Sequence, residues 1–240
     1  MSRWPTGATV RADGAVRQAD YHAPPDVTVP TYLTGHTSST ATVGYVTAPR
    51  LPRMLAWSSD NHHRLETVRT VLSDRGLRAN GYIIRGGHDA GFGCSYSILA
   101  DAQGRTRRLS VQSDVFDGER HLSLTRTPGG PWVLESSSGT VPLPALDAAQ
   151  DIDLQASAFT NSLALRRAGL IGPDVPIGTE ASVVVARVSM PELTVEPVEH
   201  HYTVLGSNQI AYSGLLGDLV LTVDNDGFVI DFPNLTHRIR

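Results

Sequence analysis

The sequence predicts an all-β protein built on an antiparallel sheet. Short runs of alternating apolar and polar residues recur from Arg53 onward, and clusters rich in Gly, Pro, Asn and Asp separate them. Regularly spaced strands with turns between them are typical of an antiparallel sheet, a sandwich or a barrel. Helix is scarce. Residues 160–168, with Thr160 as the cap and Gly169 as the end, form the one plausible helix, so we expect at most one or two short helices.

The expected strands follow one another as a meander. The alternation is clearest in residues 107–112, where Leu109 and Val111 share one face. Residues 224–227, with the sequence DNDG, predict a hairpin turn. A sheet this long must curl or close, because a flat open sheet leaves unpaired edges. The other expected strands are residues 65–72, 77–85, 92–100, 120–126, 132–134, 181–188, 200–205, 209–213, 215–224 and 228–232.

Residues 1–49 differ from the rest of the chain. They are rich in Thr, Pro, Gly and Ala, are broken by prolines, and have no helical period. They form either a loosely ordered arm laid against the domain or an extra pair of edge strands, and the arm is the favoured interpretation. Residues 50–240 then form the β domain.

The composition excludes several classes of protein. A hydrophobic content of 40% supports a sizeable core, and a formal net charge of −4 argues against a partner that is nucleic acid. The single cysteine, Cys94, excludes an intramolecular disulfide framework. Because no signal segment and no apolar run of about eighteen residues occurs, we expect a cytoplasmic protein without a transmembrane segment.

The stretch most typical of a binding site is residues 151–167, DIDLQASAFTNSLALRR. On a strand, Asp151 and Asp153 point to the same side, whereas Ile152 and Leu154 face the core. Short polar side chains and paired arginines follow within a few residues. Acids, amides and guanidinium groups at this density make a poor core and are typical of a functional loop.

The same stretch resembles the signature of a bacterial glycolipid-binding family, which carries Asp-x-Asp-Leu, then Thr-Asn, then a hydrophobic residue and two arginines. RMLAWSSDNHHRLETVRTVL is similar to the opening motif of that family, and GFVIDFPNLTHRI is similar to its closing strand. The resemblance covers about residues 53–239 in the right order. One departure is that Ala158 and Ala164 stand where the family usually has proline, which leaves the loop less constrained.

The resemblance implies a strongly curved sheet or half-barrel, similar to bacterial lipoprotein carriers that shield acyl chains from water. It also implies that the protein binds an amphipathic or hydrophobic small molecule, such as a glycolipid, in a hydrophobic cavity on the concave face. The cavity would need no cofactor. Its expected apolar lining is Leu109, Val111, Leu122, Leu124, Leu219 and Leu221.

The polar head of such a ligand has candidate partners in the central stretch. Arg166 or Arg167 would form bidentate hydrogen bonds with an anionic or sugar head, while Asp151 and Asn161 would accept bonds from hydroxyl groups. In the alternative interpretation, Asp153 and one arginine form a structural ion pair. Both interpretations remain open, with at least one of these residues structural.

Three further side chains are candidates for contact with the ligand. Glu66 shares a strand face with apolar residues, so it is either a ligand contact or a general base. Trp57 either stacks on a sugar or fills the core, and the core is favoured. His201 is the histidine expected to face the concave side, because Tyr202 and Val204 alternate against it, although a solvated histidine is the simpler interpretation.

Metal binding and catalysis are the remaining alternatives. Adjacent histidines, as in His200-His201, point to opposite faces of a strand, and no metal motif is present, so we expect no metal site. The rival function is a cofactor-independent cyclase or isomerase with Glu66 or Asp151 as the acid/base. A third possibility is a scaffold whose concave face holds its own N-terminal arm. The sequence does not predict the oligomeric state.

Overall fold

A computed structural model describes residues 51–61, 63–87, 91–127, 129–136 and 139–239. Contacts divide the chain into two units, Met1–Tyr45 and Val46–Arg240. The interpretation of residues 1–49 as an arm lies outside the described residues. All described residues belong to the second unit.

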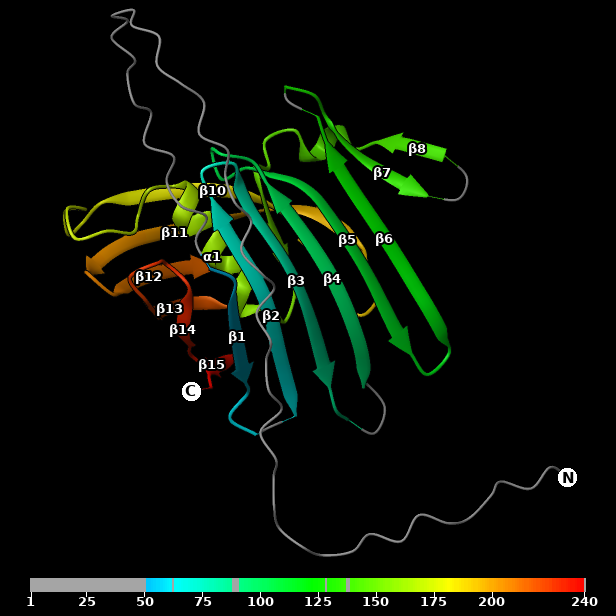
Figure 1. Ribbon diagram of the computed structural model, residues 1–240, viewed down its shortest axis with the longest axis horizontal. Helices are drawn as coiled ribbons and strands as arrows, with labels where there is room; N and C mark the ends of the chain where they lie inside the picture. Colours follow the sequence, from blue (N-terminus) through cyan, green and yellow to red (C-terminus); the bar gives the residue numbers. More distant parts are fainter. Residues whose placement is uncertain (1–50, 62, 88–90, 128, 137–138, 240) are drawn as a thin grey trace, which may run out of the picture. The chain divides into compact units, whose positions relative to one another are not determined.

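The described strands form one curved, open sheet of fifteen strands (Figure 1), which confirms the all-β prediction. The order is β8-β7-β6-β5-β4-β3-β2-β1-β15-β14-β13-β12-β11-β10-β9, so the first and last strands pair at its centre. We call β1–β8 the first arm and β9–β15 the second. The first arm comprises β1 Arg53–Ser58, β2 Arg64–Ser73, β3 Gly76–Arg85, β4 Phe92–Ala100, β5 Thr106–Val115, β6 Gly118–Arg126, β7 Trp132–Ser136 and β8 Gly139–Pro142. The second comprises β9 Asp151–Leu154, β10 Glu180–Val188, β11 Val195–Gly206, β12 Gln209–Gly214, β13 Gly217–Val223, β14 Val229–Phe232 and β15 Thr236–Arg238.

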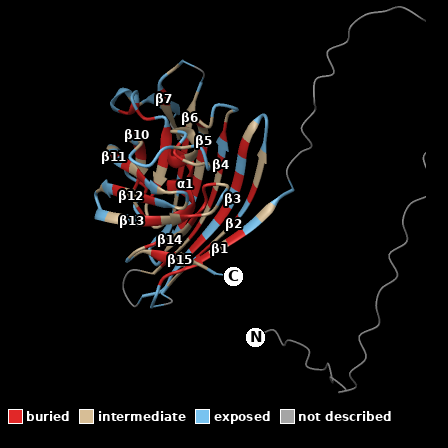
Figure 2. Ribbon diagram, turned by 90° about the vertical axis from the view of Figure 1, so that its left-hand side faces the viewer, coloured by how far each residue is buried: buried red, intermediate tan, exposed pale blue. Residues whose placement is uncertain are grey.

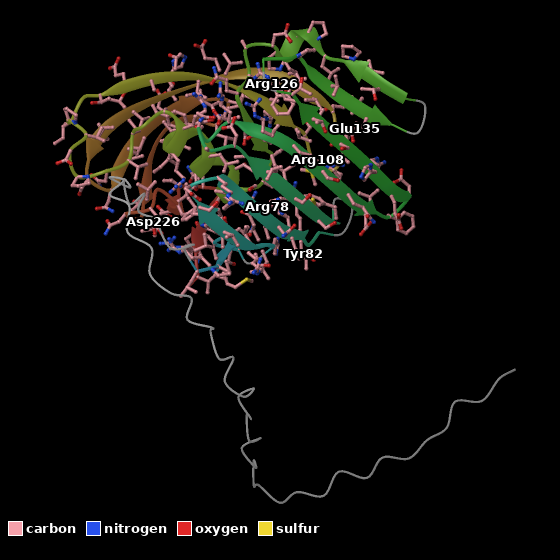
Figure 3. All side chains as sticks on the ribbon, turned by 45° about the horizontal axis from the view of Figure 1, so that its top comes forward. Arg78, Tyr82, Arg108, Arg126, Glu135 and Asp226 are labelled. Carbon is pink, nitrogen blue, oxygen red and sulfur yellow. The ribbon has the colours of Figure 1, made fainter. Side chains whose placement is uncertain are left out.

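The strands of the first arm follow from alternation and tight turns. Buried and exposed residues alternate along β2, β3 and β4 (Figure 2). The β2–β3 hairpin closes with Ser73 opposite Gly76, so only Asp74 and Arg75 form the turn. Because one residue of slippage would reverse every side chain, this turn fixes which residues of β2 and β3 face each other. Figure 3 shows the outer face, where Arg78, Tyr82 and Arg108 are exposed.

One pair of strands departs from the antiparallel prediction. β9 pairs with β10 in parallel, with Asp151 opposite Val185 and Leu154 opposite Val188. Parallel neighbours cannot be joined by a hairpin and need a longer crossover, usually a helix. The helix α1, Ala158–Arg167, lies in that crossover. Alternation of side chains does not encode strand direction, which is why the sequence did not predict this pair.

The α1 helix was predicted near its true place but with the wrong cap. It begins after Ser157, whose side chain accepts a hydrogen bond from the Thr160 amide at 3.1 Å, so Ser157 rather than Thr160 is the N-cap. It ends before Gly169, whose φ of 69° terminates the helix. Neither α1 nor the short 3-10 helix η1, Pro144–Leu146, is long and apolar enough to span a bilayer.

The helix packs on the inner face of the sheet, between the two arms (Figure 1). Phe159 stacks on Phe228 with ring centroids 5.8 Å apart and meets Trp57 edge-on at 6.5 Å. Trp57 Nε1 donates to the Val229 carbonyl at 2.9 Å. The Val229 amide in turn donates to Ser162 Oγ at 3.0 Å. Aromatic packing and buried hydrogen bonds therefore tie the helix to β1 and to the start of β14.

The predicted hydrophobic cavity on this face was not confirmed. Of the six residues expected to line it, Leu219 is half-buried and the other five are buried in the core formed by the sheet and α1. The apolar face is thus filled by the protein's own buried side chains, and the crossover helix packs against β9 and β14. The free space found on this face lies at its end, beside the start of α1.

Replacement of Phe159 by alanine tests this packing. Because the ring is fully buried between two other aromatic side chains, Phe159→Ala is expected to lower the free energy of unfolding by about 3–5 kcal/mol, measured by urea denaturation. Phe116→Ala is the matched control, since Phe116 is exposed and its loss should change stability by less than about 0.5 kcal/mol. Equal effects of the two substitutions would contradict the assigned core.

Candidate ligand-binding site

Glu66 lies on β2 and receives the N-terminus of α1. Its carboxylate accepts hydrogen bonds from Tyr96 Oη at 2.6 Å, from Ser157 Oγ at 2.6 Å and from the Ala158 amide at 2.8 Å. Burial raises the pKa of Glu66, and these hydrogen bonds oppose the rise by stabilising the charged form. Negative charge is favourable at a helix N-terminus. These buried hydrogen bonds join β2 and β4 to the N-terminus of α1, and we call them the Glu66 clamp.

Asp151 makes a second buried contact at the opposite end of the helix. Its Oδ2 accepts a hydrogen bond from Arg167 Nε at 2.6 Å, whereas Oδ1 has no partner among the described residues. The side chain is completely buried, and burial raises the pKa of Asp151 to about 6 against the lowering effect of Arg167. Asp151 and Arg167 thus form a structural ion pair of the kind that the sequence left open for Asp153.

Asp153 lies on β9 beside a histidine and an arginine. Its Oδ2 is 3.7 Å from His200 Nε2 and 4.0 Å from Arg187 Nε. Burial raises the pKa of Asp153 to about 6, opposed by Arg187. Burial, together with Arg187 and His201, lowers the pKa of His200 to about 4. At neutral pH the group therefore holds a neutral imidazole beside an ion pair.

The structure corrects the prediction for the histidine pair. His200 is buried on the inner face with Tyr202 and Val204, and its ring centroid is 5.1 Å from that of Tyr212. His201 is exposed on the outer face, where its Nδ1 is 2.7 Å from Ser182 Oγ. Residues of equal parity share a face of a strand, so Tyr202 and Val204 face the same side as His200 and not as His201.

Two adjoining cavities lie at the end of the inner face where α1 begins. The inner cavity, of about 100 Å³, has mixed walls; the outer cavity, of about 660 Å³, has mostly polar walls. Arg64, Arg85 and Leu235 line both cavities. The inner cavity is also lined by Phe92, Asp153, Gln155, Ala156, Ser157, Asn161, Arg187, Met190, Tyr212, Leu215, Leu216 and Phe232. The outer cavity is also lined by Ser59, Asp60, Asn61, His63, Gly86, Gly87 and Asn234.

Comparison with known proteins identifies the family. A family model described as "Putative glycolipid-binding" matches residues 54–238. The chain belongs to this glycolipid-binding family. The predicted resemblance over about residues 53–239 is thereby confirmed, and the matched region contains every residue that lines the two cavities.

A solved structure supports the same relationship. A crystal structure of a DUF1089 family protein from Pseudomonas aeruginosa is 27% identical in sequence and superposes with a TM-score of 0.61. The match covers 72% of this chain and 92% of that one. No curated protein matches the chain.

The site residues predicted for this glycolipid-binding family member do not lie together in one site. Asp153 and Asn161 line the inner cavity. Arg166 and Arg167 lie at the other end of α1, beside a cavity of about 210 Å³, where Arg166 donates to the Asp226 carbonyl. Trp57, Glu66 and Asp151 are buried and line none of these cavities, and His201 lies on the outer face.

The enzymatic alternative gains no support from this placement. Glu66 and Asp151, the two candidate acid/bases, are both buried, and neither lines the cavities described above. A general base must come within hydrogen-bond reach of its substrate. Within the described part of the chain, no three His, Cys, Asp or Glu side chains are grouped so that they could hold a metal ion.

Sequence reasoning missed Arg64, Arg85 and Phe92, which form one row across β2, β3 and β4. Arg64 is opposite Arg85, and Arg85 is opposite Phe92. The sequence could have identified Arg64 as an inward residue, because it is two residues before Glu66 and therefore shares its face of the strand. Placing Arg85 requires the two-residue turn at Asp74-Arg75, which lacks the usual Asn-Gly or Asp-Gly sequence.

Gly81 provides a test of the Glu66 clamp. A Cβ at Gly81 would overlap the ring of Tyr96, whose hydroxyl donates to Glu66. Gly81→Ala is therefore expected to lower the free energy of unfolding by about 2–4 kcal/mol, through overpacking and a disturbed buried hydrogen bond. Gly93→Ala on β4 is the control, because no atom lies within 4 Å of the added methyl group. Denaturation curves showing no difference between the two variants would contradict the clamp.

Asp151 should make stability depend on pH. Its pKa is about 6 in the folded protein and 3.8 as the reference value, so between these pH values the folded state binds more protons than the unfolded state. The contribution of Asp151 to stability is therefore present below pH 4 and is lost as the pH rises through 6. The free energy of unfolding of Asp151→Asn, relative to that of the wild type, should therefore rise by up to about 3 kcal/mol between pH 4 and pH 7, measured by chemical denaturation. A difference that is constant, or that moves in the wild type's favour, would refute this assignment.

Proposed function

We propose that this protein binds an amphipathic small molecule in the two adjoining cavities, with its polar head in the outer cavity and an apolar segment in the inner one. The observation that carries the proposal is the junction of a wide, mostly polar cavity with a narrower cavity of mixed walls through shared residues. Membership of the glycolipid-binding family supports the same class of ligand.

The walls of the inner cavity suit an apolar segment next to a polar head. Phe92, Tyr212 and Phe232 supply apolar surface from β4, β12 and β14, and Met190 supplies it from the β10–β11 turn. Asp153, Gln155 and Asn161 supply acceptors and donors, which suit hydroxyl groups. Binding sites of this kind combine apolar walls with a few placed polar groups.

The size of the inner cavity limits what it encloses. A volume of about 100 Å³ is below the roughly 300–1,000 Å³ of a typical small-molecule pocket. It therefore accommodates a short apolar segment, and the rest of a longer chain would continue over the rim. Leu215 and Leu216 form that rim in the β12–β13 turn and are 58% and 53% exposed.

Titration with n-octyl-β-D-glucoside below its critical micelle concentration tests the proposal, because this probe joins one sugar to one alkyl chain. Saturable binding to the full-length protein is expected in calorimetry. Replacing both rim leucines by aspartate, Leu215→Asp with Leu216→Asp, should raise the Kd about tenfold. Each substitution removes part of the apolar surface that contacts the alkyl chain.

Ile177→Asp is the matched control. Ile177 is 74% exposed and lines none of the cavities described, so its replacement should leave the affinity unchanged. Equal weakening in the rim and control variants would refute the proposed function, as would a wild type that does not bind octyl glucoside and binds dihexanoyl phosphatidic acid no more tightly than inorganic phosphate.

A further inference from the structure

Two arginines face each other at the junction of the cavities. Arg64 on β2 is directly opposite Arg85 on β3, and both line the inner and the outer cavity. Like charges directly opposite each other in an antiparallel pair are destabilising. Their juxtaposition is therefore a cost to the unliganded fold, which a bound negative charge would offset.

The interactions of these arginines within the protein leave donors free. Arg64 Nη2 donates to the Leu235 carbonyl, whereas its buried Nε has no partner among the described residues. Burial and the nearby Arg85 lower the pKa of Arg64, against the raising effect of Glu66. Neither Arg64 nor Arg85 forms an ion pair with a carboxylate in the described part of the chain.

The nearby carboxylates are already engaged. Glu66 accepts three hydrogen bonds from Tyr96, Ser157 and Ala158. Asp153, in the wall of the inner cavity, interacts with Arg187, and Asp60, in the wall of the outer cavity, lies 3.2 Å from His237 Nδ1. Neither Asp60 nor Asp153, the carboxylates in the described walls, forms an ion pair with Arg64 or Arg85, and Glu66 lies outside those walls.

We infer that Arg64 and Arg85 form an anion-binding site, and that the head of the ligand carries a phosphate or a chemically similar oxyanion. Guanidinium groups match such oxyanions through paired N–H donors. The Gly86-Gly87 backbone, which follows Arg85 in the wall of the outer cavity, adds no side chain that would obstruct the anion. This inference rests on the proposed function and specifies the chemistry of the head.

Calorimetry at low ionic strength tests the site with three probes: inorganic phosphate, dihexanoyl phosphatidic acid and n-octyl-β-D-glucoside. Wild-type protein should bind both phosphate-bearing probes, and Arg85→Gln should weaken that binding about tenfold. Tighter binding of the phosphatidic acid would identify a lipid head as the anion, and equal binding would identify a free anion. Added salt should weaken binding, because it screens the charges.

Arg78→Gln is the matched control. Arg78 lies on the same strand as Arg85 but on the outer face (Figure 3), and it lines neither cavity. Its replacement should leave phosphate binding unchanged. Arg64→Gln is a second test variant, although it also removes the hydrogen bond to Leu235, so its folding should be verified by circular dichroism.

A stability measurement separates binding from a structural role. Without ligand, Arg85→Gln relieves the repulsion and should raise the Tm by roughly 1–2 °C, whereas loss of a structural arginine would lower it. Phosphate should raise the Tm of the wild type but not of the variant.

Two outcomes distinguish failure of this inference from failure of the proposed function. If octyl glucoside binds equally to wild type and Arg85→Gln while neither phosphate probe binds, the anion site is overturned and the proposed function stands. If phosphate binds through Arg85 but octyl glucoside does not bind and phosphatidic acid binds no more tightly than phosphate, the amphipathic function fails and the anion site stands.

Discussion

The arrangement of this protein depends on a buried carboxylate that receives the N-terminus of a helix. Glu66 belongs to the first arm of the sheet, and the Ser157 hydroxyl and Ala158 amide that donate to it follow the first strand of the second arm. A buried charge is costly unless hydrogen bonds satisfy it, and here three donors do so. The contact orients α1 across the inner face and places Ser157 in the wall of the inner cavity.

The position of α1 in turn determines where free volume for a ligand remains. Because β9 and β10 are parallel, the chain between them must cross from one end of the strands to the other, and it does so over the concave side of the sheet. Phe159 then occupies the core between the two arms. Free volume remains beside the helix start, where β2 begins and β3 ends with an inward arginine. The space that the described residues leave open therefore has a polar entrance and is not an open apolar groove.

Much of the fold was predictable from the sequence, because alternation and turn residues identify strands directly. The parallel pair was not, since side-chain alternation is the same for both strand directions. The candidate site was predicted in part: Asp153 and Asn161 lie in the wall of the inner cavity. Arg166 and Arg167 do not, because a helix of ten residues is about 15 Å long and carries its last turn to the other end of the sheet. Arg64 and Arg85 depend on hairpin register, which the unusual turn sequence conceals.

The pairing of β1 with β15 has a consequence for how the chain tolerates cutting. Both free edges of the sheet, β8 and β9, come from the middle of the chain, while the first and last described strands meet at its centre. Trimming a protein usually removes peripheral structure, but deletion of β1 or β15 here would sever the sheet into halves. Proteolytic nicking between Leu143 and Gln150, in contrast, would leave every pairing between neighbouring strands of the described sheet in place, so the two fragments should remain associated.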